Sequence, residues 1–155
     1  MKLILKAGTT SDIWQIFISD SSSTTGAGLT GLVFNSASLV CYYVRPLGSD
    51  TALTLATQTV TGAHSDGGFV EVDATNMPGV YRLDLSDAIL AAGVNSVVVM
   101  LKGAANMVPL VLEIQLTNFD VNSATVTVGT NNDKTGYALT SGERTSIAEA
   151  LLKLD

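Results

Sequence analysis

Short stretches in which apolar and polar residues alternate are the feature that most constrains this fold. Between residues 108 and 117, four apolar residues are separated by single intervening residues: Leu110, Leu112, Ile114 and Leu116. A period of two is typical of a β-strand that buries one face and turns the other to water. About seven strand-like stretches follow one another at intervals of roughly ten to fifteen residues, separated by turn residues. The pattern predicts an all-β fold.

The predicted strands leave almost no room for helices between them. They cover residues 13–18, 39–45, one or two strands within 51–61, 69–73, 80–85, 96–102 and 108–117. Residues 39–45 are apolar on both faces and precede Pro46, which predicts a central strand covered on both sides. One short helix is predicted over 86–93, between the capping residue Ser86 and Gly93. This order fits a two-sheet β-sandwich better than any α/β arrangement.

The stretch 69–85 carries the clearest hairpin signal. Pro78 and Gly79 suit the central positions of a type II turn, whose second residue needs a positive φ. We therefore expect a turn over 75–79 between two strands. Alternation predicts one buried face, formed by Tyr81, Leu83 and Leu85 with Val70 and Val72 as partners. It predicts a second face in water, formed by Glu71, Asp73, Arg82 and Asp84.

The length of the chain, 155 residues, fits one domain with a short appendage. Composition changes after Phe119, so we predict an immunoglobulin-like β-sandwich over 1–119 and a linker with a C-terminal helix over 120–155. Within this appendage we expect a short extended piece at 125–128, a turn-rich link at 131–136 and a helix over 141–154.

The predicted C-terminal helix has an apolar stripe formed by Ile147, Leu151 and Leu154, which Ala148 and Leu152 widen. A helix of roughly a dozen residues is marginal in water by itself. It must therefore pack on its own sandwich or on copies of itself. We predict that Ile147, Leu151 and Leu154 form an oligomer interface.

Charge and hydropathy exclude several classes of partner. With eight Lys and Arg residues and a net charge of −6, the chain lacks the basic surface that nucleic acids or anionic membranes require. No run approaches the roughly 18 apolar residues of a membrane span, so we expect no membrane insertion. Lys6 and Gly8 interrupt the first apolar run, and we expect no cleaved export signal. The single cysteine, Cys41, lies among apolar neighbours, which favours a buried, inert thiol.

Two polar segments are candidates for catalysis or metal binding. The segment His64–Ser65–Asp66 contains the residue types of a hydrolase triad, but adjacent residues do not assemble a relay, which favours a glycine-flanked polar loop. Residues 131–136 resemble a calcium loop, but Lys134 would place a positive charge among the ligands. We therefore expect no metal site and no cofactor.

Three carboxylates and three aromatic residues suggest carbohydrate chemistry. Glu71, Asp73 and Asp84 could supply the paired carboxylates of a glycoside hydrolase, but Arg82 on the same face favours a cross-strand ion pair. We predict no enzymatic activity. Aromatic side chains could instead form a sugar-binding platform from Trp14, Tyr42 and Tyr43. Trp14 alternates with Ile16 and Ile18, which favours core packing over exposed stacking.

Several segments resemble a module found in virion proteins of tailed bacteriophages and prophages: residues 21–32, 42–46, 68–73, 76–84, 100–104 and 112–116. The resemblance covers about residues 10 to 118 and implies an immunoglobulin-like module. Gly79–Val80–Tyr81 is similar to the Gly-x-Tyr of an immunoglobulin tyrosine corner, with Met77 where that motif usually has Asp. Residues 133–140, 143–145 and 147–148 resemble a linker and helix that recur after such modules.

The resemblance implies a non-enzymatic virion structural protein of the head-decoration, head-fibre, baseplate or tail-fibre type. We expect a capsid decoration or head-fibre protein that binds other virion proteins as a homotrimer, in a virion assembled in the cytoplasm of the host bacterium. The chain ends at Asp155, whereas members of the family often continue into longer fibres, which favours a compact decoration protein. The alternative is a tail-fibre or baseplate adsorption protein whose β-sandwich binds a host surface glycan.

Overall fold

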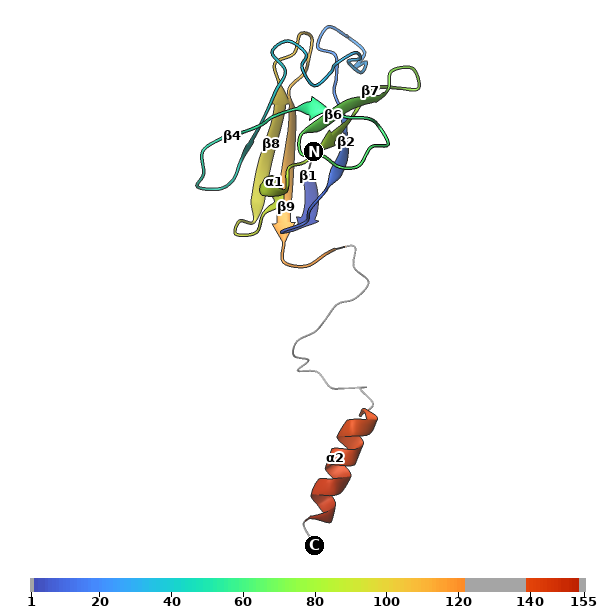
Figure 1. Cartoon of the computed structure of the whole chain (residues 1–155), viewed down its shortest axis with the longest axis vertical. Coiled ribbons are helices and arrows are strands. Elements are labelled where there is room, and N and C mark those ends of the chain that lie inside the picture. The colour runs from blue at the N-terminus through green and yellow to red at the C-terminus, as the bar shows by residue number, and fades with distance from the viewer. Residues whose placement is uncertain (1, 122–138, 154–155) are drawn as a thin grey trace. The chain divides into compact units, whose positions relative to one another are not determined.

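The computed structural model describes residues 2–121 and 139–153. The chain forms two units, Met1–Asn122 and Ser123–Asp155, and the first is a two-sheet β-sandwich (Figure 1). One sheet has five strands in the order β1 (Lys2–Lys6), β9 (Leu110–Thr117), β8 (Ser96–Lys102), β3 (Val40–Val44) and β4 (Thr51–Leu53). The other has four, in the order β2 (Ile13–Phe17), β7 (Met77–Asp84), β6 (Gly68–Asp73) and β5 (Ala56–Thr57). The predicted all-β sandwich is confirmed.

The strand order is that of an immunoglobulin-like sandwich. In one sheet β3, β8 and β9 are adjacent and antiparallel, as are strands C, F and G of that fold. In the other, β2, β7 and β6 are adjacent and antiparallel, as are strands B, E and D. Strand β1 pairs with β9 and strand β5 with β6, both in parallel. β1 is an edge strand that the sequence pattern did not predict.

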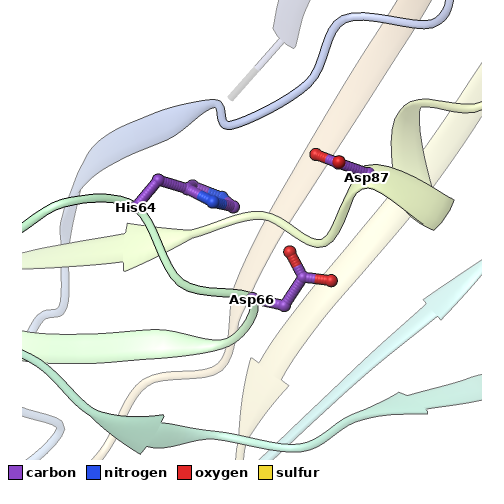
Figure 2. Close-up of side chains that lie close together, drawn as sticks. All are labelled: His64, Asp66 and Asp87. Atoms are coloured by element: carbon purple, nitrogen blue, oxygen red, sulfur yellow. The ribbon is translucent and has the colours of Figure 1, made fainter.

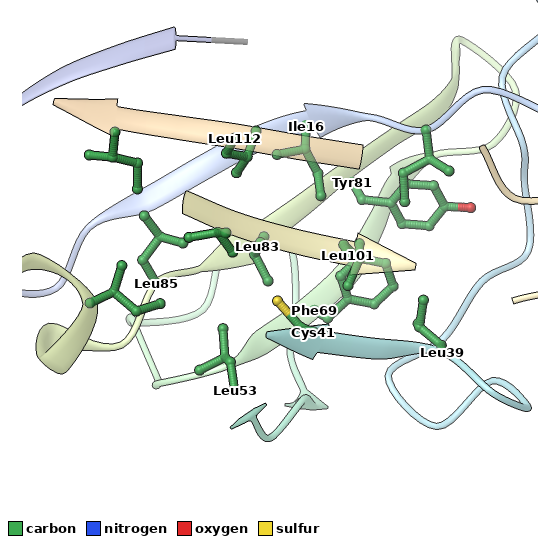
Figure 3. Packing of buried hydrophobic residues seen from close by; sticks show 14 of the residues in the cluster. Ile16, Leu39, Cys41, Leu53, Phe69, Tyr81, Leu83, Leu85, Leu101 and Leu112 are labelled. Atoms are coloured by element: carbon green, nitrogen blue, oxygen red, sulfur yellow. The ribbon is translucent and has the colours of Figure 1, made fainter. Parts of the chain in front are cut away.

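The core lies between the two sheets, where inward side chains of both meet (Figure 3). The predicted inward residues of 108–117 face this core, because Leu112, Ile114 and Leu116 are buried and Leu110 packs against them. Phe69 and Tyr81 stack with parallel rings whose centroids lie 5.0 Å apart. The helix α1 (Asp87–Leu90), capped by Ser86 as predicted, closes one end with buried Ile89 and Leu90.

The hairpin of β6 and β7 exists, but its turn was predicted in the wrong place. The chain reverses over residues 74–76, where the Asp73 carboxylate accepts hydrogen bonds from the backbone N–H groups of Thr75 and Asn76 (2.8 Å each). Pro78 and Gly79 instead lie within β7, where the pairing register shifts. Gly79 has the positive φ that the sequence indicated, +83°.

The faces of this hairpin also differ from the prediction. Tyr81, Leu83 and Leu85 are buried as expected, but Phe69 rather than Val70 faces the core with them. Arg82 and Asp84 are buried rather than in water, because residues 58–65 cover this outer face of the sheet.

Two further expectations about strands need correction. Strand β3 is covered on one side only: Cys41 and Tyr43 pack on the core, whereas Val40 and Val44 on the other side are exposed. Tyr81 is not a tyrosine corner before the strand that corresponds to F, because it lies within β7. Its hydroxyl donates to the Leu29 carbonyl (2.7 Å) and accepts from the Leu32 N–H (3.2 Å), which holds that loop to the sheet.

In the second unit, helix α2 (Ser141–Leu152) confirms the predicted C-terminal helix. The predicted extended piece 125–128, the predicted turn 131–136 and Leu154 lie outside the described residues. Among the helices that the structure describes, none is both long and apolar enough to span a membrane.

Candidate functional site

Helix α2 carries two of the three residues predicted as an oligomer interface, Ile147 and Leu151, and its local sequence explains why it forms. The Thr140 hydroxyl accepts a hydrogen bond from the backbone N–H of Glu143 (3.3 Å). In return the Glu143 carboxylate accepts one from the backbone N–H of Thr140 (2.8 Å). This capping box satisfies two N-terminal donors without any tertiary contact.

The apolar side chains of α2 are uncovered. Ile147, Leu151 and Leu152 are 48%, 62% and 77% exposed, and no residue of the helix is buried. Ile147 and Leu151 lie four positions apart on one side of the helix, whereas Leu152 lies about 100° further round. Leu152 therefore widens the apolar surface, as the sequence predicted. An exposed apolar arc on a helix this short fits burial against a partner.

Arg82 and Asp84, which the sequence placed in water, form a buried ion pair on a single strand. The Arg82 Nε and Nη2 atoms donate to the two Asp84 carboxylate oxygens at 2.7 and 2.9 Å. Arg82 Nη1 also donates to the carbonyl oxygens of Thr59, Val60 and Gly62 at 2.8 to 3.0 Å. The predicted cross-strand pair is thus wrong, and the pair instead anchors residues 59–62 over the sheet.

The surroundings of Asp84 favour its ionised form. Burial alone would raise the pKa of Asp84, but hydrogen bonds from Arg82, from the Ser65 backbone N–H and from the Gln58 amide outweigh it and hold the pKa below its usual value. A carboxylate held in this way is a poor general acid at neutral pH. Its role is structural.

The other two candidate carboxylates also have structural partners. One Glu71 oxygen accepts from the Gly31 N–H (2.9 Å), and its second oxygen is buried without a hydrogen-bond partner among the described residues. Hydrogen bonds from Asn76 lower the pKa of Asp73, which organises the hairpin turn. Burial raises the pKa of the neighbouring Tyr81 hydroxyl to about 12, and the Glu71 charge adds to the shift. Glu71, Asp73 and Asp84 therefore do not form a paired-carboxylate centre.

His64 and Asp66 lie near a residue that the sequence did not connect with them. Figure 2 shows both on the loop before β6, with Asp87 at the start of α1. One ligand atom from each lies within 4.8 Å of the others, a spacing that could admit a metal ion. The His64 Nε2 atom lies 2.8 Å from the Leu85 carbonyl oxygen, and the Asp87 carboxylate accepts from the Ser11 N–H (2.8 Å). Exposed acidic groups commonly gather in this way without a metal, and we assign this cluster no ligand.

The three aromatic candidates do not form a platform. Trp14 on β2 packs against the core and donates its indole N–H to the Asp12 carboxylate, as its alternation with Ile16 indicated. Tyr43 also packs against the core, whereas Tyr42 faces outward on the other side of β3. Only one of the three rings is thus available on an outer face.

Cys41 is buried at 2% exposure, and burial raises the pKa of its thiol to about 12. The predicted inert thiol agrees with this environment.

Comparison with protein-family models, with curated proteins and with solved structures finds no match to this chain.

The structure itself adds one surface that the sequence reasoning missed, the outer side of the five-stranded sheet. Its signal was present in β8, where Val97, Val98, Val99 and Met100 are consecutive, so that both faces of the strand are apolar.

Proposed function

We propose that this protein is a non-enzymatic structural component of a bacteriophage virion, a capsid decoration or head-fibre protein that binds other virion proteins as a homotrimer. The exposed apolar arc of α2 carries the assembly part of this proposal. The resemblance of residues 10–118 to modules of virion proteins carries the rest.

The proposed three-fold arrangement meets the requirement that a short helix buries its exposed apolar side chains against a partner. One copy of α2 cannot bury Ile147, Leu151 and Leu152 by itself, whereas a bundle of three parallel copies can bury all of them around a common axis. The Thr140 and Glu143 cap fixes the residue at which the helix begins in each copy.

The glycan-binding alternative has less support. A sugar platform needs neighbouring exposed rings, and Trp14 and Tyr43 pack against the core. The candidate carboxylates are engaged in a turn, a loop contact and an ion pair, which supports a role without catalysis.

The proposal of a virion component is tested by cryo-electron microscopy and mass spectrometry of purified particles from a strain that carries the gene. We expect the protein in stoichiometric amounts, with its density on the outer surface of the head. Absence from the particles would refute the proposal, and density at a tail tip would replace the head location with adsorption.

The assembly step is tested separately with the double variant Ile147→Asp and Leu151→Asp. We expect light scattering to report trimers for the wild-type chain and folded monomers for the double variant, because six aspartates would meet at one axis. The matched control, Ser146→Asp, adds a charge on the side of the helix away from Leu151 and should remain trimeric. A wild-type chain that is monomeric at micromolar concentration contradicts the trimer.

A further inference from the structure

The outer surfaces of the two sheets differ in how they are covered. On the four-stranded sheet, residues 58–65 lie over β6 and β7 and are held there by Arg82 and Asp84. On the five-stranded sheet no segment among the described residues lies over the centre, yet most outward side chains at the centre of three adjacent strands are apolar. The apolar ones are Val40, Tyr42, Val44, Val98, Met100 and Val111, which we call the outer apolar face. Lys102 on β8 and Glu113 on β9, which forms an ion pair with Lys2, border them.

These six side chains form one continuous surface. Met100 pairs with Tyr42 on one side and with Val111 on the other, and Val98 pairs with Val44. The four valines are 36% to 43% exposed. Because an antiparallel sheet with one face in water normally carries polar residues there, an apolar area that spans three strands indicates a contact surface.

Two charged residues stand at opposite ends of this face. Lys102 on β8 pairs with Val40, whereas Asp50 precedes β4 at the level of Val44, and both line the same shallow groove. They lie about 10 Å apart across the strands and about 13 Å along them, too far to pair within one chain. Neither side chain has an ion-pair partner among the described residues.

This arrangement is self-complementary. Tyr42 lies midway between Lys102 and Asp50, both across the strands and along them. A two-fold axis in the plane of the interface that passes through Tyr42 exchanges the two ends. Lys102 of each copy then faces Asp50 of the other, and the apolar side chains meet between them. The Glu113 side chains of the two copies lie near the axis at one edge, where Lys2 of the same chain neutralises each of them.

We propose that the outer apolar face binds the same face of a second copy of this chain, with Tyr42 at the two-fold axis and two Lys102–Asp50 pairs at its ends. Four strands by three outward rows give an area on the order of 400 Å² per copy. Standard interfaces bury about 800 Å² per partner, so this self-association is weak, roughly micromolar or weaker. The proposal does not depend on the role in a virion or on assembly through α2.

The test uses the full chain with Ile147→Asp and Leu151→Asp, so that any association through α2 is removed. Sedimentation velocity from about 10 to 500 µM should show a concentration-dependent dimer. Asp50→Lys or Lys102→Glu alone should raise its dissociation constant about tenfold, because like charges then face each other twice. The variant that combines Asp50→Lys with Lys102→Glu should restore the dissociation constant to within about threefold of the parent value.

Two further variants distinguish association through this face from non-specific association. Tyr42→Asp should abolish the dimer, because two charges would be buried at the axis. Phe17→Asp is the matched control, since Phe17 is 47% exposed on the outer side of the other sheet, and it should leave the dimer unchanged. Melting temperatures confirm that each variant is folded. The proposal is overturned if no dimer forms at 500 µM, if the double exchange fails to restore it, or if Phe17→Asp disrupts it equally.

Discussion

At Gly28 and Gly79 two backbone segments cross without room for a side chain. A Cβ atom on Gly79 would lie 2.4 Å from the Gly28 Cα and 2.9 Å from the Ile18 carbonyl oxygen. The same residue has φ +83°, a conformation that disfavours every residue with a Cβ. The loop that Tyr81 holds is therefore also fixed by a pair of glycines.

Gly79→Ala should lower the free energy of unfolding by about 3 kcal/mol, because strain at positive φ adds to a clash with backbone atoms. The matched control is Gly26→Ala, at φ +75° with no atom within 4 Å of the added Cβ, where only the strain of about 1–2 kcal/mol applies. Urea unfolding of the two variants measures the difference. Equal losses would show that the close approach of Gly28 costs nothing.

Asp84 gives the sandwich an acid-sensitive contact. Its folded-state pKa lies below the unfolded value of about 3.9, so its contribution to stability is complete above pH 4 and is lost as the pH falls through the folded pKa. Asp84→Asn should flatten the pH dependence of unfolding between about pH 5 and pH 2. At pH 7 the same variant should be less stable by about 3–5 kcal/mol, since Arg82 would keep a buried charge without its carboxylate.

The control for this variant is Asp66→Asn, an exposed residue on the loop before β6, which should change stability by less than about 0.5 kcal/mol. If Asp84→Asn shows the same acid transition as the wild type, another carboxylate is responsible for it.

Among the elements, those with a strict period of two were predictable and those that depend on distant partners were not. Alternation in Leu110–Thr117 gave the strand and its buried face, and Ser86 marked the start of α1. Nothing near Lys2–Lys6 indicated β1, because its hydrogen-bond partners lie on β9, at the other end of the sandwich sequence. The Pro78–Gly79 pair correctly predicted a positive φ at Gly79. It was read as a turn because a shift in strand register can require the same backbone geometry.

The burial of the charged residues of β7 could not be predicted from the local sequence either. Local alternation places Arg82 and Asp84 outward, and the backbone does so too. Their burial depends on residues 58–65 crossing the sheet, which is a tertiary contact that no local pattern encodes. The helix α2 was accessible to sequence reasoning because a helical period is local, whereas the grouping of His64 and Asp66 with Asp87 was not.

The C-terminal end of helix α1 is held by a side chain that follows strand β3, Arg45. The Arg45 guanidinium donates to the carbonyl oxygens of Ala88, Ile89, Ala91 and Ala92 at 2.7 to 3.2 Å. These groups lie at or just beyond the C-terminal end of α1, where backbone carbonyls have no partners within the helix. Arg45 thus links α1 to the five-stranded sheet.

Arg45→Lys should therefore lower the free energy of unfolding by about 1–2 kcal/mol although the charge is kept, because an ammonium group cannot reach four carbonyl oxygens at once. Hydrogen exchange should show faster opening at residues 87–92 than in the wild type. Arg45→Met, which also removes the charge, should lose more. An Arg45→Lys variant as stable as the wild type would show that charge alone holds α1.

For the whole molecule, the division into two units places the folded core in the first unit and the proposed assembly contact in the second. The sandwich has a continuous core drawn from both sheets, whereas every residue of α2 is exposed. Apolar burial is the main source of folding free energy, so we expect the sandwich to fold without the helix.

Deleting residues 141–155 should therefore leave the melting temperature of the sandwich within about 3 °C of the wild-type value, because a helix without buried residues removes no core when it is lost. The same deletion should convert trimers to monomers at low micromolar concentration in light scattering, with the weak dimer through the outer apolar face still detectable at higher concentration. Thermal unfolding followed by circular dichroism near 218 nm reports the sheets, and sedimentation velocity reports the assembly. A deletion that unfolds the sandwich would place the helix in its core, and a deletion that leaves trimers intact would place the three-fold contact on the sandwich.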